Sequence, residues 1–169
     1  MKEHFKDGKL DGLSTYFYEN GVKMLEVYYK YGEKNGLKTH WYPNEKIWYE
    51  RYYKFGKKDG PWTEWYFNEQ MKLKEYFKNG KKDGIFNSWY KNGKKRLEEH
   101  YKDGNKNGLF ISWYENGNKS LKENFKDGNK DGVSTSWYKN GNKWYRRHYK
   151  NGKKNGLDTE WYENGNKWY

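Results

Sequence analysis

The sequence predicts an all-β protein, in which one elongated antiparallel meander is built from about seven 24-residue hairpin repeats stacked as in a solenoid. The first observation is the fixed 24-residue period, which is typical of repeat architectures. The second is the recurrence of Asn-Gly between alternating runs, the strongest short-range signal for a β-hairpin. The third is composition: the chain has no alanine and is 22% aromatic, which disfavours helices. We expect about 14 short strands.

Two glycines and an aromatic pair mark every repeat. The first glycine recurs at Gly8, Gly32, Gly56, Gly80, Gly104, Gly128 and Gly152. The second recurs at Gly12, Gly36, Gly60, Gly84, Gly108, Gly132 and Gly156. The aromatic pair follows in step, as Phe17-Tyr18, Trp41-Tyr42, Trp65-Tyr66, Trp89-Tyr90, Trp113-Tyr114, Trp137-Tyr138 and Trp161-Tyr162. No insertion or deletion interrupts the series, so we expect one supersecondary unit that stacks on its neighbours.

These residues resemble the MORN repeat variant, whose motif is G-x-x-D/N-G-x-x-x-x-W-Y-x-N-G-x. The resemblance covers essentially all of Met1 to Tyr169, with departures at Leu10 and in the turns Asn44-Glu45 and Asn68-Glu69. Proteins made wholly of this repeat are similar to YwqK-type antitoxin and immunity proteins, so the resemblance implies binding to a toxin that acts on nucleic acid. Conventional MORN proteins are associated with anionic lipids and with assembly of larger complexes, which is the alternative implication.

Composition limits the class of protein. A length of 169 residues with an unbroken period predicts a single domain, 1–169. Only 33% of residues are hydrophobic and most of these are aromatic, so we expect a thin body of stacked rings. The chain has no cysteine and no apolar run long enough for a membrane span or signal peptide. We therefore expect a cytoplasmic protein, or one from which a leader has been trimmed.

The hairpin of one repeat predicts which side chains share a face. We expect a strand from Leu109 to Tyr114, a three-residue Glu-Asn-Gly loop, and a return strand from about Asn118 to Lys126. Pairing Tyr114 with Asn118 would put one scaffold set on one face: Leu109, Ile111, Trp113, Leu121, Glu123 and Phe125. The Gly-rich segments that join hairpins, such as Lys126 to Gly132, lack the P-loop pattern and are interpreted as turns.

The polar residues do not predict catalysis. The histidines His100 and His148 lie two repeats apart, roughly 19 Å, so they cannot share a metal ion or a triad. Glu75, Glu99 and Glu123 recur one repeat apart, roughly 9 to 10 Å, near the carboxylate spacing of an inverting glycosidase. Cross-strand pairing with lysine and tyrosine explains them better. We expect no catalytic, cofactor-binding or metal site, no cofactor, and no enzymatic activity.

Two features favour binding. On the face opposite the scaffold set we expect exposed aromatic residues that bind a partner: Trp48, Tyr52, Trp62, Tyr76, Phe86, Phe110 and Trp144, with Tyr16, Tyr28 and Trp168 in the same series. The alternative is that twisting and edge packing cover them. Lysines before and within the joining turns are expected to project from one basic rim: Lys54, Lys58, Lys78, Lys82, Lys102, Lys106, Lys126, Lys130, Lys150 and Lys154. Interleaved aspartates dilute the field of that rim.

The predicted function is binding. A net charge of +12 favours an acidic protein, a nucleic acid or an anionic membrane surface, or serves solubility alone. The leading hypothesis is a non-enzymatic interaction protein that binds and neutralises a macromolecule, as an antitoxin, an immunity protein, or a phage-type inhibitor of a nuclease or CRISPR effector does. The alternatives are an anionic-lipid or scaffold-assembly module, and salt-sensitive RNA binding through the lysine rim.

Overall fold

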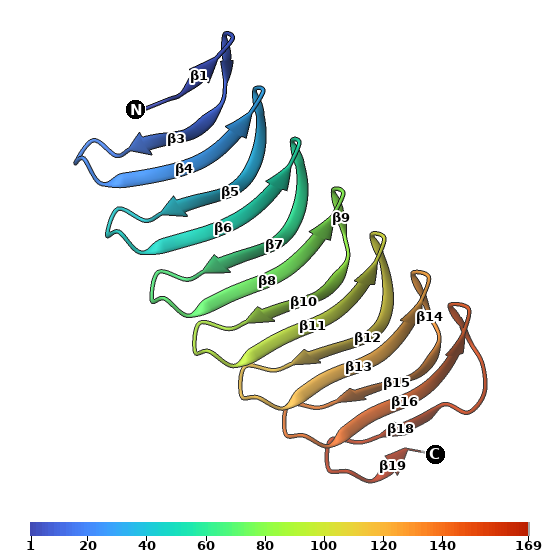
Figure 1. Cartoon of the computed structure of the whole chain (residues 1–169). Coiled ribbons are helices and arrows are strands. Elements are labelled where there is room, and N and C mark those ends of the chain that lie inside the picture. The colour runs from blue at the N-terminus through green and yellow to red at the C-terminus, as the bar shows by residue number, and fades with distance from the viewer. Residues whose placement is uncertain (169) are drawn as a thin grey trace. The chain divides into compact units, whose positions relative to one another are not determined.

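The computed structural model describes residues 1–168 and contains antiparallel strands with no helix in that range. The strands follow one another as hairpins in an open meander (Figure 1). The prediction of an all-β meander of hairpin repeats is confirmed. By internal contacts the chain divides into unit 1, Met1–Lys82, and unit 2, Asp83–Tyr169. The single domain predicted from length stays a prediction.

Unit 1 is a meander preceded by a small separate hairpin. Its strands are β1 (Phe5–Lys6), β2 (Lys9–Leu10), β3 (Gly12–Phe17), β4 (Lys23–Lys30), β5 (Glu33–Trp41), β6 (Ile47–Lys54), β7 (Lys57–Trp65), β8 (Met71–Lys78) and β9 (Lys81–Lys82). Strand β1 pairs with β2, and each strand from β3 to β8 pairs with the next one in the chain. The hairpin connections therefore alternate between two edges of the sheet (Figure 1).

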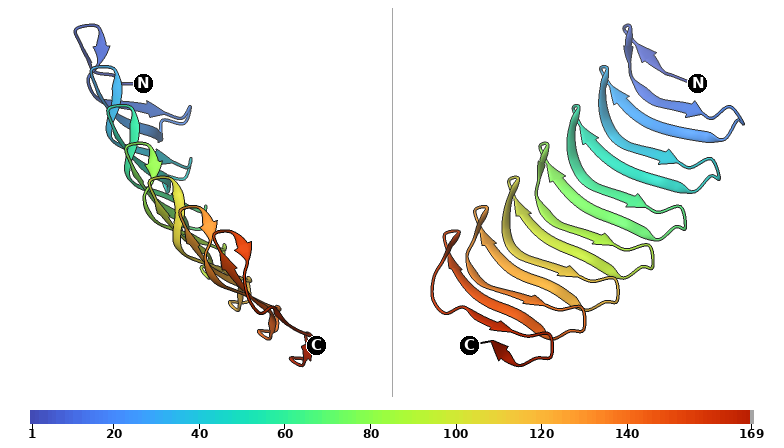
Figure 2. Two further views of the ribbon diagram at one scale, coloured as in Figure 1. Left: turned by 90° about the vertical axis from the view of Figure 1, so that its right-hand side faces the viewer. Right: turned by 180° about the vertical axis from the view of Figure 1, so that it is seen from behind.

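Unit 2 repeats the plan with shorter strand segments. Its strands are β10 (Gly84–Trp89), β11 (Lys95–Lys102), β12 (Asn105–Trp113), β13 (Lys119–Lys126), β14 (Asn129–Lys130), β15 (Gly132–Trp137), β16 (Lys143–Lys150), β17 (Lys153–Lys154), β18 (Thr159–Trp161) and β19 (Lys167–Trp168). Strand β13 pairs with both β14 and β15, and β16 with both β17 and β18, because the first strand of these two repeats is interrupted (Figure 2). This interruption raises the number of strands above the expected 14.

The turn after each aromatic pair has the predicted three-residue loop. In unit 2 the Tyr114 N–H donates to the Asn118 carbonyl at 2.8 Å, and the Gly117 N–H donates to the Tyr114 carbonyl at 2.9 Å. Gly117 has a φ of 100°, a backbone conformation that residues with a side chain rarely adopt. The Asn116 side chain accepts a hydrogen bond from the Asn118 N–H at 3.0 Å, which closes the turn.

The predicted scaffold face is wrong because a β-bulge follows this turn. Trp113 pairs with Lys119, but the preceding residue, Ser112, pairs with Leu121, so one extra residue is inserted in the return strand. A slip of one residue sends side chains to the opposite face. Leu109 and Ile111 consequently lie on one face with Asn124 and Lys122, whereas Leu121, Glu123 and Phe125 lie on the other.

Two faces of each unit are named by the residues that they carry. In unit 1, face A carries Lys38, Arg51, Trp62 and Glu75, which are paired in series across β5 to β8. Face B of unit 1 carries the pairs Leu37–Tyr52 and Thr39–Glu50. In unit 2, the equivalent face A carries Phe86, Glu99, Phe110 and Glu123, and face B carries Ile85, His100, Leu109 and Asn124.

The sheet is held by side chains that link successive repeats. The tyrosine hydroxyl of an aromatic pair donates to the backbone carbonyl of the tryptophan in the next repeat, from Tyr18 to Trp41 at 2.7 Å and from Tyr114 to Trp137 at 2.8 Å. The second glycine of the repeat allows close approach between strands. A Cβ at Gly60 would lie 3.1 Å from the Tyr52 Cβ, at a φ of 106°. Among residues 1–168 the buried hydrophobic side chains are Val27, Tyr49, Trp62 and Phe77, all on face A of unit 1.

Candidate interaction surfaces

The first candidate surface begins at two hairpin tips in unit 1. The turns Tyr31-Gly32 and Phe55-Gly56 join β4 to β5 and β6 to β7, and all four residues have positive φ angles. Such two-residue type I′ turns favour Asn or Asp before the glycine. In this chain the equivalent residues are Asp7, Asn79, Asp103, Asp127 and Asn151, and only unit 1 places aromatic residues there. Tyr31 and Phe55 thus adopt left-handed backbone conformations, with φ of 53° and 46°.

Both tips are exposed and fixed in position. Tyr31 is 62% exposed and Phe55 55% exposed. The Tyr31 N–H donates to an Asp11 carboxylate oxygen at 3.2 Å, and the Phe55 N–H donates to the Asn35 side-chain oxygen at 3.2 Å. These bonds from the preceding repeat hold the backbone in its left-handed conformation. The rings therefore project into solvent from an ordered turn.

Exposed tyrosines lie three residues before the tips. Tyr28, Tyr52 and Tyr76 are exposed and recur at the same repeat position on face B, two strands or roughly 9 to 10 Å apart. We call the set Tyr28, Tyr31, Tyr52, Phe55 and Tyr76 the aromatic edge. In unit 2 the positions of the three tyrosines hold His100, Asn124 and His148. The exposed lysines Lys30, Lys54 and Lys78 accompany the aromatic edge.

The second candidate surface is on face A of unit 1. Four cations surround three aromatic rings there, and we call Lys34, Lys38, Arg51 and Lys58 the cation cluster. The Arg51 guanidinium carbon lies 3.8 Å from the Tyr49 ring centroid and 4.6 Å from that of Trp62. The Lys58 Nζ lies 3.9 Å from the Trp62 centroid. Lys34 and Lys38 lie 5.3 and 5.5 Å from the rings of Tyr53 and Tyr49, so the cluster is continuous across β5, β6 and β7.

Burial and mutual repulsion make this cluster electrostatically costly. Burial, together with Lys38 and Arg51, lowers the pKa of Lys34. Burial and Arg51 likewise lower the pKa of Lys38. Burial also lowers the pKa of His40, and the positive charge of the neighbouring Lys38 lowers it further. This histidine therefore adds no charge at neutral pH. Arg51 donates to Glu64 at 2.6 Å, but its Nε is buried without a hydrogen-bond partner.

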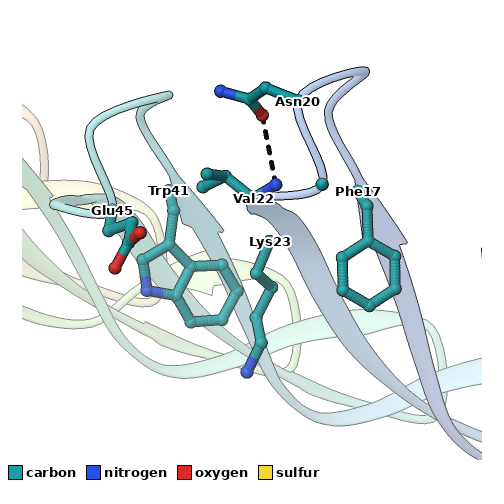
Figure 3. Close-up of a pocket in the computed structure, with 7 residues that line it drawn as sticks. Phe17, Asn20, Val22, Lys23, Trp41 and Glu45 are labelled. Carbon is teal, nitrogen blue, oxygen red and sulfur yellow. Dashed lines mark hydrogen bonds between the residues drawn. The ribbon is translucent and has the colours of Figure 1, made fainter.

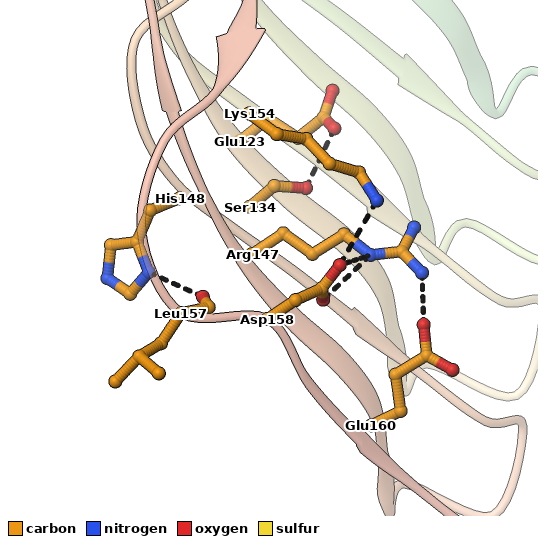
Figure 4. A network of polar contacts seen from close by, with 8 residues as sticks. All are labelled: Glu123, Ser134, Arg147, His148, Lys154, Leu157, Asp158 and Glu160. Atoms are coloured by element: carbon orange, nitrogen blue, oxygen red, sulfur yellow. Dashed lines mark hydrogen bonds and ion pairs between the residues drawn. The ribbon is translucent and has the colours of Figure 1, made fainter.

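Face A of unit 2 is arranged differently, with a carboxylate for each cation. Lys106 pairs with Glu99 at 2.7 Å and Lys130 with Glu123 at 2.5 Å. Figure 4 shows the Ser134 hydroxyl, which donates to Glu123 at 2.9 Å. The same view shows Arg147 bound to Asp158 and Glu160, with Lys154 also on Asp158. These charges are mutually compensated, so this face is a structural network.

A shallow hollow lies on face B of unit 1. It has a volume of about 550 Å³ and lies between the rings of Phe17 and Trp41, with the Lys23 side chain extended between them (Figure 3). The Lys23 Nζ is 5.0 Å from the Trp41 ring centroid. The hollow brings no acid, base and nucleophile together. It is a surface groove that the lysine partly fills.

The predicted partner-binding aromatics do not share one face, so that part of the prediction is wrong. Tyr52 and Tyr76 lie on face B of unit 1, but Trp62 lies on face A and is only 8% exposed. Trp48 is the extra residue of a bulge and packs with His40 and Tyr49 on face A. In unit 2, the predicted residues also fall on face A: Phe86, Phe110 and Trp144. The bulge after each turn is the cause. A role of these residues in binding stays a prediction.

The predicted lysine rim divides into two sets. Lys54, Lys78, Lys102, Lys126 and Lys150 are exposed at strand ends. The other five lie in the strands that follow the joining turns: Lys58, Lys82, Lys106, Lys130 and Lys154. There Lys82, Lys106 and Lys130 pair with glutamates on face A, and Lys154 pairs with Asp158. The single rim of projecting charges is therefore wrong, because the two-residue turn is followed directly by a paired strand.

The recurring glutamates of face A are paired with lysines. Glu99 and Glu123 are buried under lysine pairs, in keeping with cross-strand pairing. Among residues 1–168 no three His, Cys, Asp or Glu side chains are grouped so that they could hold a metal ion. Nor do those residues form any helix with the length and hydrophobicity that a membrane span requires.

A comparison with models of protein families finds a repeat family that fits this architecture. The MORN repeat variant model matches six segments, residues 10–31, 34–55, 58–80, 82–103, 106–127 and 130–151. The matches cover well over half of the chain, which therefore belongs to the MORN repeat variant family. A comparison with curated proteins finds no match. The repeats define a protein-interaction module.

Sequence reasoning missed Tyr31, Phe55, Lys38 and Arg51 as candidates. For Tyr31, Phe55 and Arg51 the signal was present in the alignment of the repeats with one another. Aromatic residues stand where the other turns have Asp or Asn, and Arg51 stands where three later repeats have Glu75, Glu99 and Glu123.

Proposed function

We propose that this protein is a non-enzymatic interaction module that binds a protein target through the aromatic edge and blocks its activity. The observation that carries the proposal is the placement of Tyr31 and Phe55, two exposed aromatic side chains in left-handed turns. Unfavourable backbone conformations that surrounding contacts hold in place are a pointer to function. Rigid, exposed aromatic residues are common anchors in protein interfaces.

The chemistry of the edge specifies the kind of partner. The five rings need apolar pockets, and Lys30, Lys54 and Lys78 beside them need acidic side chains. We therefore propose an acidic protein surface with hydrophobic pockets as the target. The resemblance to antitoxin and immunity repeat proteins supports a toxin or effector that acts on nucleic acid, such as a nuclease or CRISPR effector.

The test is capture by the full-length protein from host lysate, with nuclease treatment and a salt series. The comparison is between the wild type, Tyr31→Asn with Phe55→Asn, and the control Asn79→Asp, which retains a polar residue in an equivalent turn. We expect the wild type and the control to retain the same protein after nuclease treatment and the double variant to lose it. The purified target should then be inhibited by the wild type at equimolar concentration.

Three outcomes would reject the proposal. Capture that survives in the double variant would show that the aromatic edge is not the interface. Retention of nucleic acid or lipid alone would place the function elsewhere. If the target is bound but keeps its full activity, the proposal that this protein neutralises its target is rejected.

A further inference from the structure

We propose that face A of unit 1 binds single-stranded nucleic acid, with the cation cluster on the phosphates and Trp48 against a base. This surface lies on the face of the sheet, whereas the aromatic edge includes turn tips. The inference therefore goes beyond the proposed protein interaction and can fail separately from it.

The charge pattern of the repeats singles out this surface. In three repeats a lysine pairs with the glutamate seven residues before it: Lys82 with Glu75 at 2.8 Å, Lys106 with Glu99 at 2.7 Å, and Lys130 with Glu123 at 2.5 Å. The residue seven positions before Lys58 is Arg51, and the one before Lys34 is Val27. At Lys34 and Lys58 the carboxylate is thus replaced by an apolar group or a cation. Lys154 also follows a cation, Arg147, but Asp158 pairs with both of them.

Three of the four cations of the cluster have no compensating carboxylate. Within residues 1–168, Lys34, Lys38 and Lys58 form no ion pair with a carboxylate. Glu64 is the carboxylate bound to Arg51, at 2.6 Å, and it also contacts Lys72 at 3.4 Å. The single negative charge of Glu64 is therefore shared by Arg51 and Lys72, and it neutralises none of the three lysines of the cluster. Partly buried, uncompensated charges destabilise the free protein and favour an anionic ligand.

The guanidinium of Arg51 gives the cluster planar, directional donors. It is fixed between the rings of Tyr49 and Trp62, and its Nε has no hydrogen-bond partner in the protein. Planar guanidinium donors match phosphate oxygens. Phosphate is consequently the anion that suits the cluster best.

An exposed ring next to the cations distinguishes nucleic acid from other polyanions. Trp48 is 38% exposed and stacks on Tyr42, with ring centroids 5.5 Å apart and an angle of 21° between the planes. It also lies 5.5 Å from Tyr49, whose ring contacts Lys38 and Arg51. A lipid headgroup or an acidic peptide would use the cations and leave this ring unused. Cations beside a ring that can stack on a base are the usual elements of a single-strand site.

The test is fluorescence anisotropy with a labelled oligouridylate of about 12 nucleotides, titrated with full-length protein at about 50 mM salt. Lys38→Gln with Lys58→Gln removes two charges from the cluster. Lys102→Gln with Lys126→Gln removes two exposed charges from unit 2 and is the matched control. Circular dichroism checks that each variant is folded.

We expect the cluster variant to weaken binding at least tenfold, and the control variant less than about twofold. The slope of log affinity against log salt should flatten by about 1.4 in the cluster variant, two contacts at about 0.7 each. Trp48→Ala should weaken oligonucleotide binding about tenfold. Polyglutamate of equal charge and phosphatidylserine vesicles should compete poorly with the RNA.

Equal losses in the cluster and control variants would show binding by net charge alone and overturn the inference. Unchanged binding in Trp48→Ala, or equal competition by polyglutamate or vesicles, would overturn the assignment to nucleic acid. Absence of binding by the folded wild type at low salt would also overturn it.

Discussion

Replacing Tyr31 and Phe55 by asparagine should make the protein more stable while abolishing its capture of a partner. Both residues have left-handed backbone conformations, with φ of 53° and 46°. Such a conformation costs an ordinary L-residue about 1–2 kcal/mol, and asparagine tolerates it better. The rings contribute little to the fold because they are 62% and 55% exposed. The contact of Lys30 with the Tyr31 ring, at 5.6 Å, is worth about 0.5 kcal/mol at an exposed site.

The net gain is therefore about 0.5–1.5 kcal/mol for Tyr31→Asn, and we expect a similar gain for Phe55→Asn. Urea unfolding should show a higher midpoint with an unchanged slope, and each kcal/mol should raise Tm by about 2–4 °C at this chain length. Asn79→Phe, the reverse change in an equivalent turn whose φ is 50°, should lower the stability by a similar amount. A double asparagine variant less stable than the wild type would refute the reasoning, since it would mean that the rings pack against the fold.

Two further predictions concern the repeat itself. Gly60→Ala should destabilise the protein by about 1–3 kcal/mol, measured by urea unfolding, because φ is 106° and the new Cβ would lie 3.1 Å from the Tyr52 Cβ. Gly80→Ala, where φ is 84° and no atom lies within 4 Å, should cost less, and equal costs would contradict the role of the close approach. Hydrogen bonds from Lys95 and His100 lower the pKa of Glu98 against the opposing effect of burial. This carboxylate therefore stabilises the fold above its unfolded pKa of about 4.3, and its contribution is lost as pH falls through the lower folded value. The difference in unfolding free energy between wild type and Glu98→Gln should shrink as pH falls from about 6 to 3, and a constant difference would disprove the linkage.

The period and turn chemistry were sufficient to predict the hairpins, since the three-residue loop at Glu115 to Gly117 forms as expected. The faces were predicted wrongly because one extra residue, Ser120, separates the turn from the regular pairing. Nothing in the local composition requires a bulge there. Because successive side chains of a strand point to opposite faces of the sheet, one extra residue reverses the face of every side chain that follows it. The same error moved Trp62 from a buried position under Lys58 and Arg51 to a predicted exposed surface.

The candidate residues follow from comparing the repeats with one another. A repeat scaffold fixes the residues that turns and strand packing require, so a residue that departs from them at a cost needs another explanation. Phe55 departs in an exposed turn where backbone geometry favours Asn or Asp, and Arg51 departs where a carboxylate would neutralise Lys58. Both departures lie in β6 or the turn after it, although they face different surfaces. Substitutions at either position can therefore test the two proposed binding activities separately within one repeat, because a general loss of stability would affect both.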